Sequence, residues 1–343
     1  MRAAVFHGPG KALAIEEVPT PVAGPGEVLL RVAACGICRT DLHYLHGTPT
    51  FKAPPLILGH EISGTIAAVG PGVEPFKAGD KALVPPVFSC GHCGFCRAGR
   101  GTLCTNQVMV GNHRDGGFAE FVAVPANQIF PFPANVPLVE GCVISDALST
   151  PYHAVVNRAE VRPGSTVAVF GCGGVGIGAV HIAALLGATV IAVDVFPAKL
   201  ELARTFGASM TIDASKETDV PKAIRKLTGG GADVAMEVIG NPKTIEQAFN
   251  AVRWGGRVVV VGFTDQNVTL NGGRLMFREI EVKGSLGCPL QDFPRLLELV
   301  KGGRLRGADL VTHKFPLERI NEGLALLEKG DPTLIRAVAV VSA

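Results

Sequence analysis

The second half of the chain alternates short apolar strands with helices, and this alternation constrains the fold more than any other feature. Apolar stretches at 167–170 and 189–193 are followed by helical stretches at 177–186 and 198–206. Neighbouring parallel strands need crossover connections of about this length, and such crossovers are almost always right-handed. The pattern continues in three further expected strands at 234–238, 257–261 and 280–283. The chain from residue 150 therefore predicts an α/β domain with a doubly wound parallel sheet.

The first part of the chain has a different pattern, of short strands separated by Gly- and Pro-rich turns. These strands are expected at 28–32, 64–69, 81–84 and 118–122. Such a pattern predicts a β-rich, partly closed barrel. A helix at 293–301 precedes a short mixed tail that we expect to return to the first domain. The predicted organisation is one domain of residues 1–149 and 290–343, with residues 150–289 forming the other.

Composition and charge exclude several classes of protein. With 343 residues, the chain is long enough for two ordinary domains. Its 32 basic and 30 acidic residues form no basic block, so nucleic acid is not an expected partner. The longest apolar region, 167–196, is interrupted by glycines, His181 and Asp194, so we expect no membrane association. No secretory signal pattern follows Met1, and we expect a cytoplasmic protein.

A glycine-rich turn directly follows the predicted strand 167–170. Its sequence is Gly171-Cys172-Gly173-Gly174-Val175-Gly176, and it opens the next helix. In a dinucleotide site, such glycines make the tight turn, admit the pyrophosphate and allow close packing of helix on strand. Asp194 ends the next strand, where a carboxylate accepts the ribose hydroxyls of NAD and repels the 2′-phosphate of NADP. Lys199, five residues further on, is a second candidate to contact the adenosine ribose. The alternative is a glycine turn that binds nothing.

Four cysteines lie close together in a Gly- and Arg-rich segment with no helix or strand pattern. They are Cys90, Cys93, Cys96 and Cys104. Four thiolates satisfy tetrahedral zinc and leave no open position, so this spacing predicts a structural zinc. The alternatives are two disulfides, or His92 in place of one cysteine.

A second group of possible metal ligands carries a family resemblance. Cys35-Gly36-Ile37-Cys38 alone also fits a redox pair, but Arg39-Thr40-Asp41-Leu42-His43 follows it, and Gly59-His60-Glu61 comes later. Together with the cysteine segment and the glycine turn, in the same order, these motifs resemble the medium-chain zinc alcohol dehydrogenase family over essentially the whole chain. The resemblance implies a GroES-like catalytic domain and a Rossmann cofactor domain.

The resemblance implies that Cys38 and His60 bind a catalytic zinc, which makes two zinc ions per chain. The family's third ligand is commonly a cysteine, but Asp146 stands at the matching position before Thr150. Some bacterial secondary-alcohol dehydrogenases resemble this chain in having Asp there. A carboxylate makes the site harder, so cobalt, manganese or iron compete better for it. Glu61 is a candidate for an additional or exchanging ligand, and Cys142 is expected in the core.

The resemblance also implies roles in proton transfer and in cofactor binding. Thr40, the nicotinamide ribose and His43 correspond to the family's proton relay, in which a histidine exchanges protons with water. Arg39 and Arg336 correspond to arginines that contact the pyrophosphate, and Thr150 is assigned to the cofactor site.

The expected activity is therefore transfer of a hydride between a primary or secondary alcohol and NAD, giving an aldehyde or a ketone. One alternative is a polyol, sugar or amino-alcohol dehydrogenase of the same superfamily. Another is a catalytically silent NAD-binding zinc protein, which would not need the ligands and the relay together. The family resemblance implies a homodimer or homotetramer, with 281–286 as the expected pairing strand.

Overall fold

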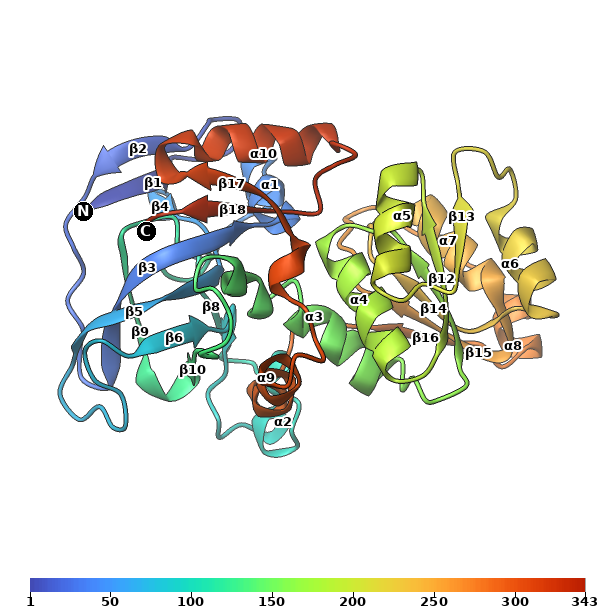
Figure 1. The fold of residues 1–343 in the computed structure, drawn as a ribbon, viewed down its shortest axis with the longest axis horizontal. Coiled ribbons are helices and arrows are strands. Elements are labelled where there is room, and N and C mark those ends of the chain that lie inside the picture. Colours follow the sequence, from blue (N-terminus) through green and yellow to red (C-terminus); the bar gives the residue numbers. More distant parts are fainter. Residues whose placement is uncertain (343) are drawn as a thin grey trace. The chain divides into compact units, whose positions relative to one another are not determined.

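The computed structural model describes residues 1–342, and the chain divides into two compact units (Figure 1). One unit is Met1–Ser149 together with the chain from Gly287 onward, and the other is Thr150–Leu286. The second boundary falls at Gly287, where the sequence predicts residue 290. Within residues 1–342, no helix is both long and apolar enough to cross a membrane.

The second unit contains a six-stranded, fully parallel sheet. Its strands, in spatial order, are β13 (Met210–Asp213), β12 (Thr189–Asp194), β11 (Thr166–Phe170), β14 (Ala232–Glu237), β15 (Val252–Val260) and β16 (Glu281–Gly284). The chain runs outward from β11 to β13 and then returns to continue on the other side from β14. The direction therefore reverses between β11 and β14, and ligands of such sheets bind at this switch point.

Helices cover both faces of this sheet. In Figure 1, α4 (Gly174–Leu185) and α5 (Pro197–Thr205) lie together on one side, and α6 (Val220–Thr228) and α7 (Pro242–Ala251) lie on the other. The chain enters this unit through α3 (Ser149–Tyr152) and a π-helical segment, His153–Arg158. A short helix, α8 (Gly272–Phe277), precedes the edge strand β16. The predicted doubly wound parallel sheet is confirmed.

The first unit is built mainly from antiparallel strands. Its largest sheet has the order β10 (Phe130–Pro131), β6 (Lys81–Val84), β5 (Glu61–Val69), β3 (Glu27–Ile37), β18 (Arg336–Val340) and β17 (Val311–Pro316), and β9 (Phe121–Pro125) also pairs with β3. A smaller sheet has the order β2 (Ala14–Glu17), β1 (Arg2–Phe6) and β4 (Leu56–Ile57), and a third contains β7 (Val87–Phe88) and β8 (Val108–Met109).

The helices of this unit are short and peripheral to the sheets. The α-helices are α1 (Arg39–Leu45), α2 (Gly94–Arg97), α9 (Phe293–Lys301) and α10 (Ile320–Lys329), and one of several 3-10 helices, η3, is at Glu140–Ile144. Figure 1 shows α10 lying over β17 and β18. Inward-facing side chains such as Phe6, Leu30, Ile62 and Phe118 are fully buried and form the core.

One predicted strand of this unit is wrong in its position. The expected strand at 118–122 is observed as β9, at Phe121–Pro125. The backbone of Phe118 pairs elsewhere: its N–H donates to Leu58 and its carbonyl accepts from Ala4. These tertiary partners decide where the strand begins, and the local sequence does not identify them.

Candidate active site

Three predicted metal ligands converge within the first unit. Cys38 directly follows β3 and caps the start of α1, His60 directly precedes β5, and Asp146 follows η3. In the antiparallel pair of β3 and β5, Gly36 lies opposite Glu61, so Cys38 and His60 come from neighbouring strand ends. The ligand atoms of the three residues lie within 4.8 Å of one another, and all three residues are buried.

The spacing of these atoms fits a tetrahedral zinc. The Oδ2 atom of Asp146 lies 3.5 Å from the Sγ atom of Cys38 and 3.6 Å from the Nε2 atom of His60. Zinc at its usual bond lengths would separate sulfur, nitrogen and oxygen ligands by about 3.3 to 3.6 Å. The donor set and its geometry therefore suit zinc with three protein ligands and one open position.

Asp41 supports this group, although the sequence analysis gave it no role. Its Oδ2 atom accepts a hydrogen bond from the backbone N–H of Cys38 at 2.8 Å, and its Oδ1 atom lies 3.7 Å from Nδ1 of His60. A carboxylate facing Nδ1 favours a proton on that nitrogen and leaves Nε2 for a metal. The capping position of Asp41, three residues after Cys38, is the sequence signal that could have identified it.

The electrostatics of the site favour a cation. Burial alone would lower the pKa of His60, but the Asp146 carboxylate and the Cys38 sulfur outweigh it and hold this pKa well above its ordinary value. The same negative environment would stabilise a divalent metal among these side chains.

Glu61 does not point its carboxylate at the three ligands. Its Oε1 atom accepts from the backbone N–H of Ala147 at 2.7 Å, and its Oε2 atom accepts from Nε of Arg336 at 2.8 Å. Arg336 also donates from Nη2 to Oδ2 of Asp146 at 2.8 Å. The structure thus gives Arg336 a buried position between two carboxylates, where the resemblance led us to expect a phosphate contact.

Gly36 leaves the space that the Glu61 carboxyl group occupies. A Cβ atom added at Gly36 would lie 1.5 Å from Oε2 of Glu61, and Glu61 is fully buried. We therefore expect Gly36→Ala to destabilise the protein by about 3 kcal/mol, because a buried ion pair must move or break. Urea unfolding followed by circular dichroism measures this. Gly272→Ala is the control, because its Cβ would meet nothing within 4 Å. An equal, small effect of both substitutions would contradict the prediction.

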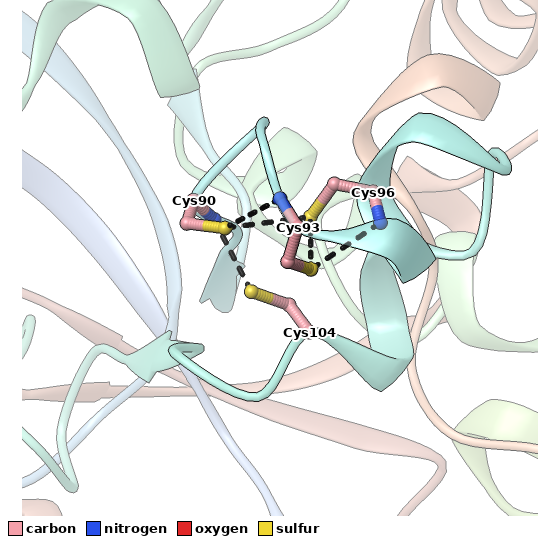
Figure 2. A group of neighbouring side chains, drawn as sticks. All are labelled: Cys90, Cys93, Cys96 and Cys104. Atoms are coloured by element: carbon pink, nitrogen blue, oxygen red, sulfur yellow. Dashed lines mark hydrogen bonds between the residues drawn. The ribbon is translucent and has the colours of Figure 1, made fainter.

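The four cysteines of the predicted structural site also converge. Figure 2 shows their sulfur atoms turned toward one another, and all lie within 4.8 Å. The Sγ atom of Cys96 lies 3.5 Å from that of Cys93 and 3.9 Å from that of Cys90. A disulfide requires about 2.05 Å, whereas four sulfurs around zinc would lie about 3.8 Å apart.

Backbone N–H groups donate hydrogen bonds to the sulfurs of Cys90, Cys93 and Cys104, whereas burial raises the pKa of Cys96 to about 11. The N–H of Cys93 donates to Cys90 at 3.3 Å, and the N–H of Cys90 donates to Cys104 at 3.3 Å. The N–H of Cys96 lowers the pKa of Cys93 to about 6. The Nδ1 atom of His92 instead donates to the carbonyl oxygen of Cys90. The sulfurs fit zinc better than two disulfides, and His92 is outside the group.

The glycine-rich turn lies at the switch point of the parallel sheet. It directly follows β11, and α4 begins after Gly173. A Cβ at Gly176 would lie 1.9 Å from the carbonyl oxygen of Gly171, so this contact between turn and helix requires glycine. The free N–H groups at the start of α4, from Gly174 and Val175 onward, suit a pyrophosphate.

Asp194 organises this turn. Its two oxygens accept from the N–H groups of Cys172 at 2.7 Å and Phe196 at 3.0 Å. The Nζ atom of Lys199 lies 5.0 Å from the centre of the Phe196 ring. The sequence analysis identified these side chains but not the bonds between Asp194 and the turn.

The remaining predicted residues lie near the start of α1, in η3 or at the start of the second unit. The hydroxyl of Thr40 lies 3.7 Å from Sγ of Cys38. His43 is one turn further along α1 and half-buried, whereas Arg39 is exposed. Thr150 is buried at the first position of the second unit. Cys142 is fully buried, as expected for a core residue.

Both units of the chain match alcohol dehydrogenases and their relatives among known proteins. Residues 24–134 match the family model described as alcohol dehydrogenase GroES-like domain, and residues 174–302 match that described as zinc-binding dehydrogenase. The chain is 38% identical to an alcohol dehydrogenase of Geobacillus stearothermophilus over 96% of each chain. It is 36% identical to a sorbitol dehydrogenase of Bacillus subtilis, over 94% of this chain and 92% of that one. The crystal structure of an NAD-dependent alcohol dehydrogenase superposes with a TM-score of 0.93 at 34% identity, covering 100% of both chains.

Proposed function

The chain belongs to the zinc-dependent medium-chain alcohol dehydrogenase family, and from that premise we propose that it transfers a hydride between a primary or secondary alcohol and NAD. The observation that carries the proposal is the convergence of Cys38, His60 and Asp146 in one buried group. A merely structural zinc would be expected to have four protein ligands, as the cysteine group offers. Three ligands leave a position for the substrate.

When bound, zinc would act as a Lewis acid toward the substrate oxygen, and NAD would accept the hydride. Cys38, His60 and Asp146 would hold the metal. Thr40 lies close enough to Cys38 to accept a hydrogen bond from a substrate hydroxyl at this position. His43, three residues later on the same helix face, is half-buried and can exchange a proton with water.

For the cofactor, we propose that the glycine turn and Asp194 bind NAD in preference to NADP. Asp194 ends β12 beside the turn, so its negative charge would oppose a 2′-phosphate there. Arg39, which is exposed at the start of α1, is the candidate contact for the pyrophosphate.

The test of this proposal is a substrate panel. The zinc-loaded protein is mixed with NAD or NADP and with primary, secondary, benzylic and polyol substrates, and reduced nicotinamide is followed by absorbance. We expect turnover with NAD on simple alcohols. Turnover confined to polyols would favour the alternative, for which the sorbitol dehydrogenase relative is the supporting observation. A protein that binds NADH but oxidises no substrate would contradict the proposed activity.

Thr40→Val should lower kcat by on the order of 10²-fold, because the substrate hydroxyl loses its proton acceptor. NADH affinity, measured by fluorescence titration, should change by less than about threefold if the hydroxyl acts in proton transfer alone. Thr333→Val, at an exposed position of the same unit, is the matched control. A Thr40→Val enzyme with unchanged kcat would rule out this hydroxyl as part of the relay.

We also propose a homodimer or homotetramer formed through the sheet edge of the second unit. β16 ends the sheet, and Val282 and Leu286 on or beside it are exposed. Unpaired edge strands with apolar side chains commonly pair with a second copy. Light scattering should give the mass of two or four chains, and Leu286→Asp should lower it. Val22→Asp, at an exposed apolar residue of the first unit, is the control. A monomeric wild-type protein would contradict this proposal.

A cytoplasmic location is part of the proposal. Among residues 1–342, no two cysteines are joined by a disulfide, and a reducing compartment keeps their sulfurs available for metals. Cell fractionation with antibodies to the protein tests it, and recovery outside the cytoplasmic fraction would contradict it.

A further inference from the structure

Arg336 is not a metal ligand, yet it lies directly against the predicted catalytic metal site. We propose that Arg336 is a positioning residue that fixes Asp146 as the third metal ligand, with Glu61 holding the guanidinium group in place. The inference rests on the proposed catalytic metal site and adds a determinant of its metal affinity.

The bond from Arg336 goes to the oxygen of Asp146 that faces the other ligands. Nη2 of Arg336 donates to Oδ2 at 2.8 Å, and the same Oδ2 lies 3.5 Å from Cys38 Sγ and 3.6 Å from His60 Nε2. A carboxylate oxygen has two lone pairs, so it can accept from an arginine and still bind a metal. Turning the carboxylate away from Cys38 and His60 would break a charge-assisted hydrogen bond inside the protein.

Glu61 accepts hydrogen bonds both from Arg336 and from the backbone next to Asp146. Its Oε2 accepts from Nε of Arg336 at 2.8 Å, and its Oε1 accepts from the N–H of Ala147 at 2.7 Å. Asp146 follows the short 3-10 helix η3 and belongs to no strand or helix of its own. The bond to Ala147 therefore fixes a backbone segment that the sheet does not fix.

The sheet brings Glu61 and Arg336 together across one strand. β3 lies between β5 and β18, and Gly36 on β3 is opposite Glu61 on one side and Val338 on the other. Because Gly36 has no side chain, the carboxyl group of Glu61 extends over β3 toward the start of β18, where Arg336 lies. The guanidinium group is thus anchored by side chains of the protein itself.

The charges explain why an arginine is needed at this position. The buried side chains around this site include the carboxyl groups of Asp41, Glu61 and Asp146 together with the Cys38 sulfur. Arg336 brings a positive charge among them, and breaking this pairing would leave buried carboxylates uncompensated.

The experiment measures zinc affinity directly. Zinc is titrated against a colorimetric chelator in the wild type, in Arg336→Met and in Arg319→Met, with the four-cysteine site as an internal reference for folding. Arg319 also pairs with a carboxylate, Glu322, but is exposed. We expect Arg336→Met to weaken zinc binding at the three-ligand site by about 10- to 100-fold, the usual cost of removing a partner of a ligand. Arg319→Met should have no effect.

One further background and one further measurement separate the possible explanations. In an Asp146→Cys background, Arg336→Met should weaken zinc binding by less than about threefold, because the bond to the carboxylate no longer exists. NADH affinity of the zinc-saturated Arg336→Met protein should also change by less than about threefold. Unchanged zinc affinity in Arg336→Met would overturn the inference, as would an equal loss in both backgrounds. Weaker NADH binding with normal zinc affinity would assign Arg336 to the phosphates instead.

The experiments distinguish a failure of the proposed metal site from a failure of the proposed role of Arg336. Asp146→Ala with undiminished zinc binding would contradict the metal site itself, whereas loss in Asp146→Ala but not in Arg336→Met would contradict only the role of Arg336. If Arg336→Met loses the four-cysteine zinc as well, it is misfolded and Arg336→Lys replaces it. The lysine keeps the charge but cannot bridge both carboxylates with a planar group, so an intermediate loss of zinc affinity is expected. Wild-type zinc affinity in Arg336→Lys would overturn the inference.

Discussion

Asp146→Ala should lower kcat for alcohol oxidation by roughly 10³-fold or more, since it removes a metal ligand on which charge stabilisation of the reacting oxygen depends. Cys38 and His60 would remain as the only members of the three-ligand group, and Arg336 would lose one of its two carboxylate partners. Zinc content measured by mass spectrometry should fall from two ions per chain toward one. The remaining zinc would belong to the four-cysteine site.

The control for this prediction is Asp309→Ala, an exposed aspartate of the same unit. It should keep both its zinc content and its rate. Circular dichroism of the Asp146→Ala protein should stay close to that of the wild type, so that the lost rate reflects the site. If Asp146→Ala retains its second zinc and a rate within about threefold of the wild type, the carboxylate is not required as a ligand.

Cys96→Ser should lower the melting temperature by on the order of 10 °C, because a structural zinc site contributes several kcal/mol to folding. The segment around it contains only α2 and a one-turn 3-10 helix, and most of its side chains are exposed or half-buried. With so little apolar burial, a bound metal would replace a hydrophobic core there. Scanning calorimetry measures the shift, and the loss of one zinc per chain should accompany it.

His92→Ala is the matched control, because this residue lies between two of the cysteines and its ring hydrogen-bonds to the carbonyl oxygen of Cys90. The substitution keeps the backbone N–H of His92, which lowers the pKa of Cys90. It should melt within about 2 °C of the wild type. Limited proteolysis should cut Cys96→Ser, but not His92→Ala, between residues 91 and 103. Equal melting temperatures for Cys96→Ser and the wild type would mean that the segment is held without metal.

The sequence was sufficient for the features that depend on local pattern. The glycine turn follows β11 and opens α4 as predicted, and α9 has the predicted bounds of 293–301. Three further expected strands, at 189–193, 234–238 and 280–283, overlap β12, β14 and β16. Strands and helices of this kind are specified by the spacing of apolar residues along the chain, which one sequence contains.

The sequence was insufficient for contacts between residues that lie far apart in the chain. Arg336 is 190 residues from Asp146 and 275 from Glu61, and no local pattern indicates that these three side chains meet. Gly36 was visible only as part of a Cys-x-x-Cys motif, since its steric role depends on a carboxylate from the neighbouring strand. The pairing of Phe118 with Leu58 and Ala4 is of the same kind. Such contacts follow from strand order, which the pattern of a single chain does not determine.

The position of β18 between β3 and β17 has a consequence for how the molecule is made. The second unit is one continuous stretch, so a ribosome has completed all of its strands before residue 287 is added. The first unit lacks an interior strand until residues 336–340 emerge. The ribosome therefore adds Arg336 long after Cys38, His60 and Asp146. The three-ligand site, with the arginine that hydrogen-bonds to Asp146, is among the last parts of the protein to be completed.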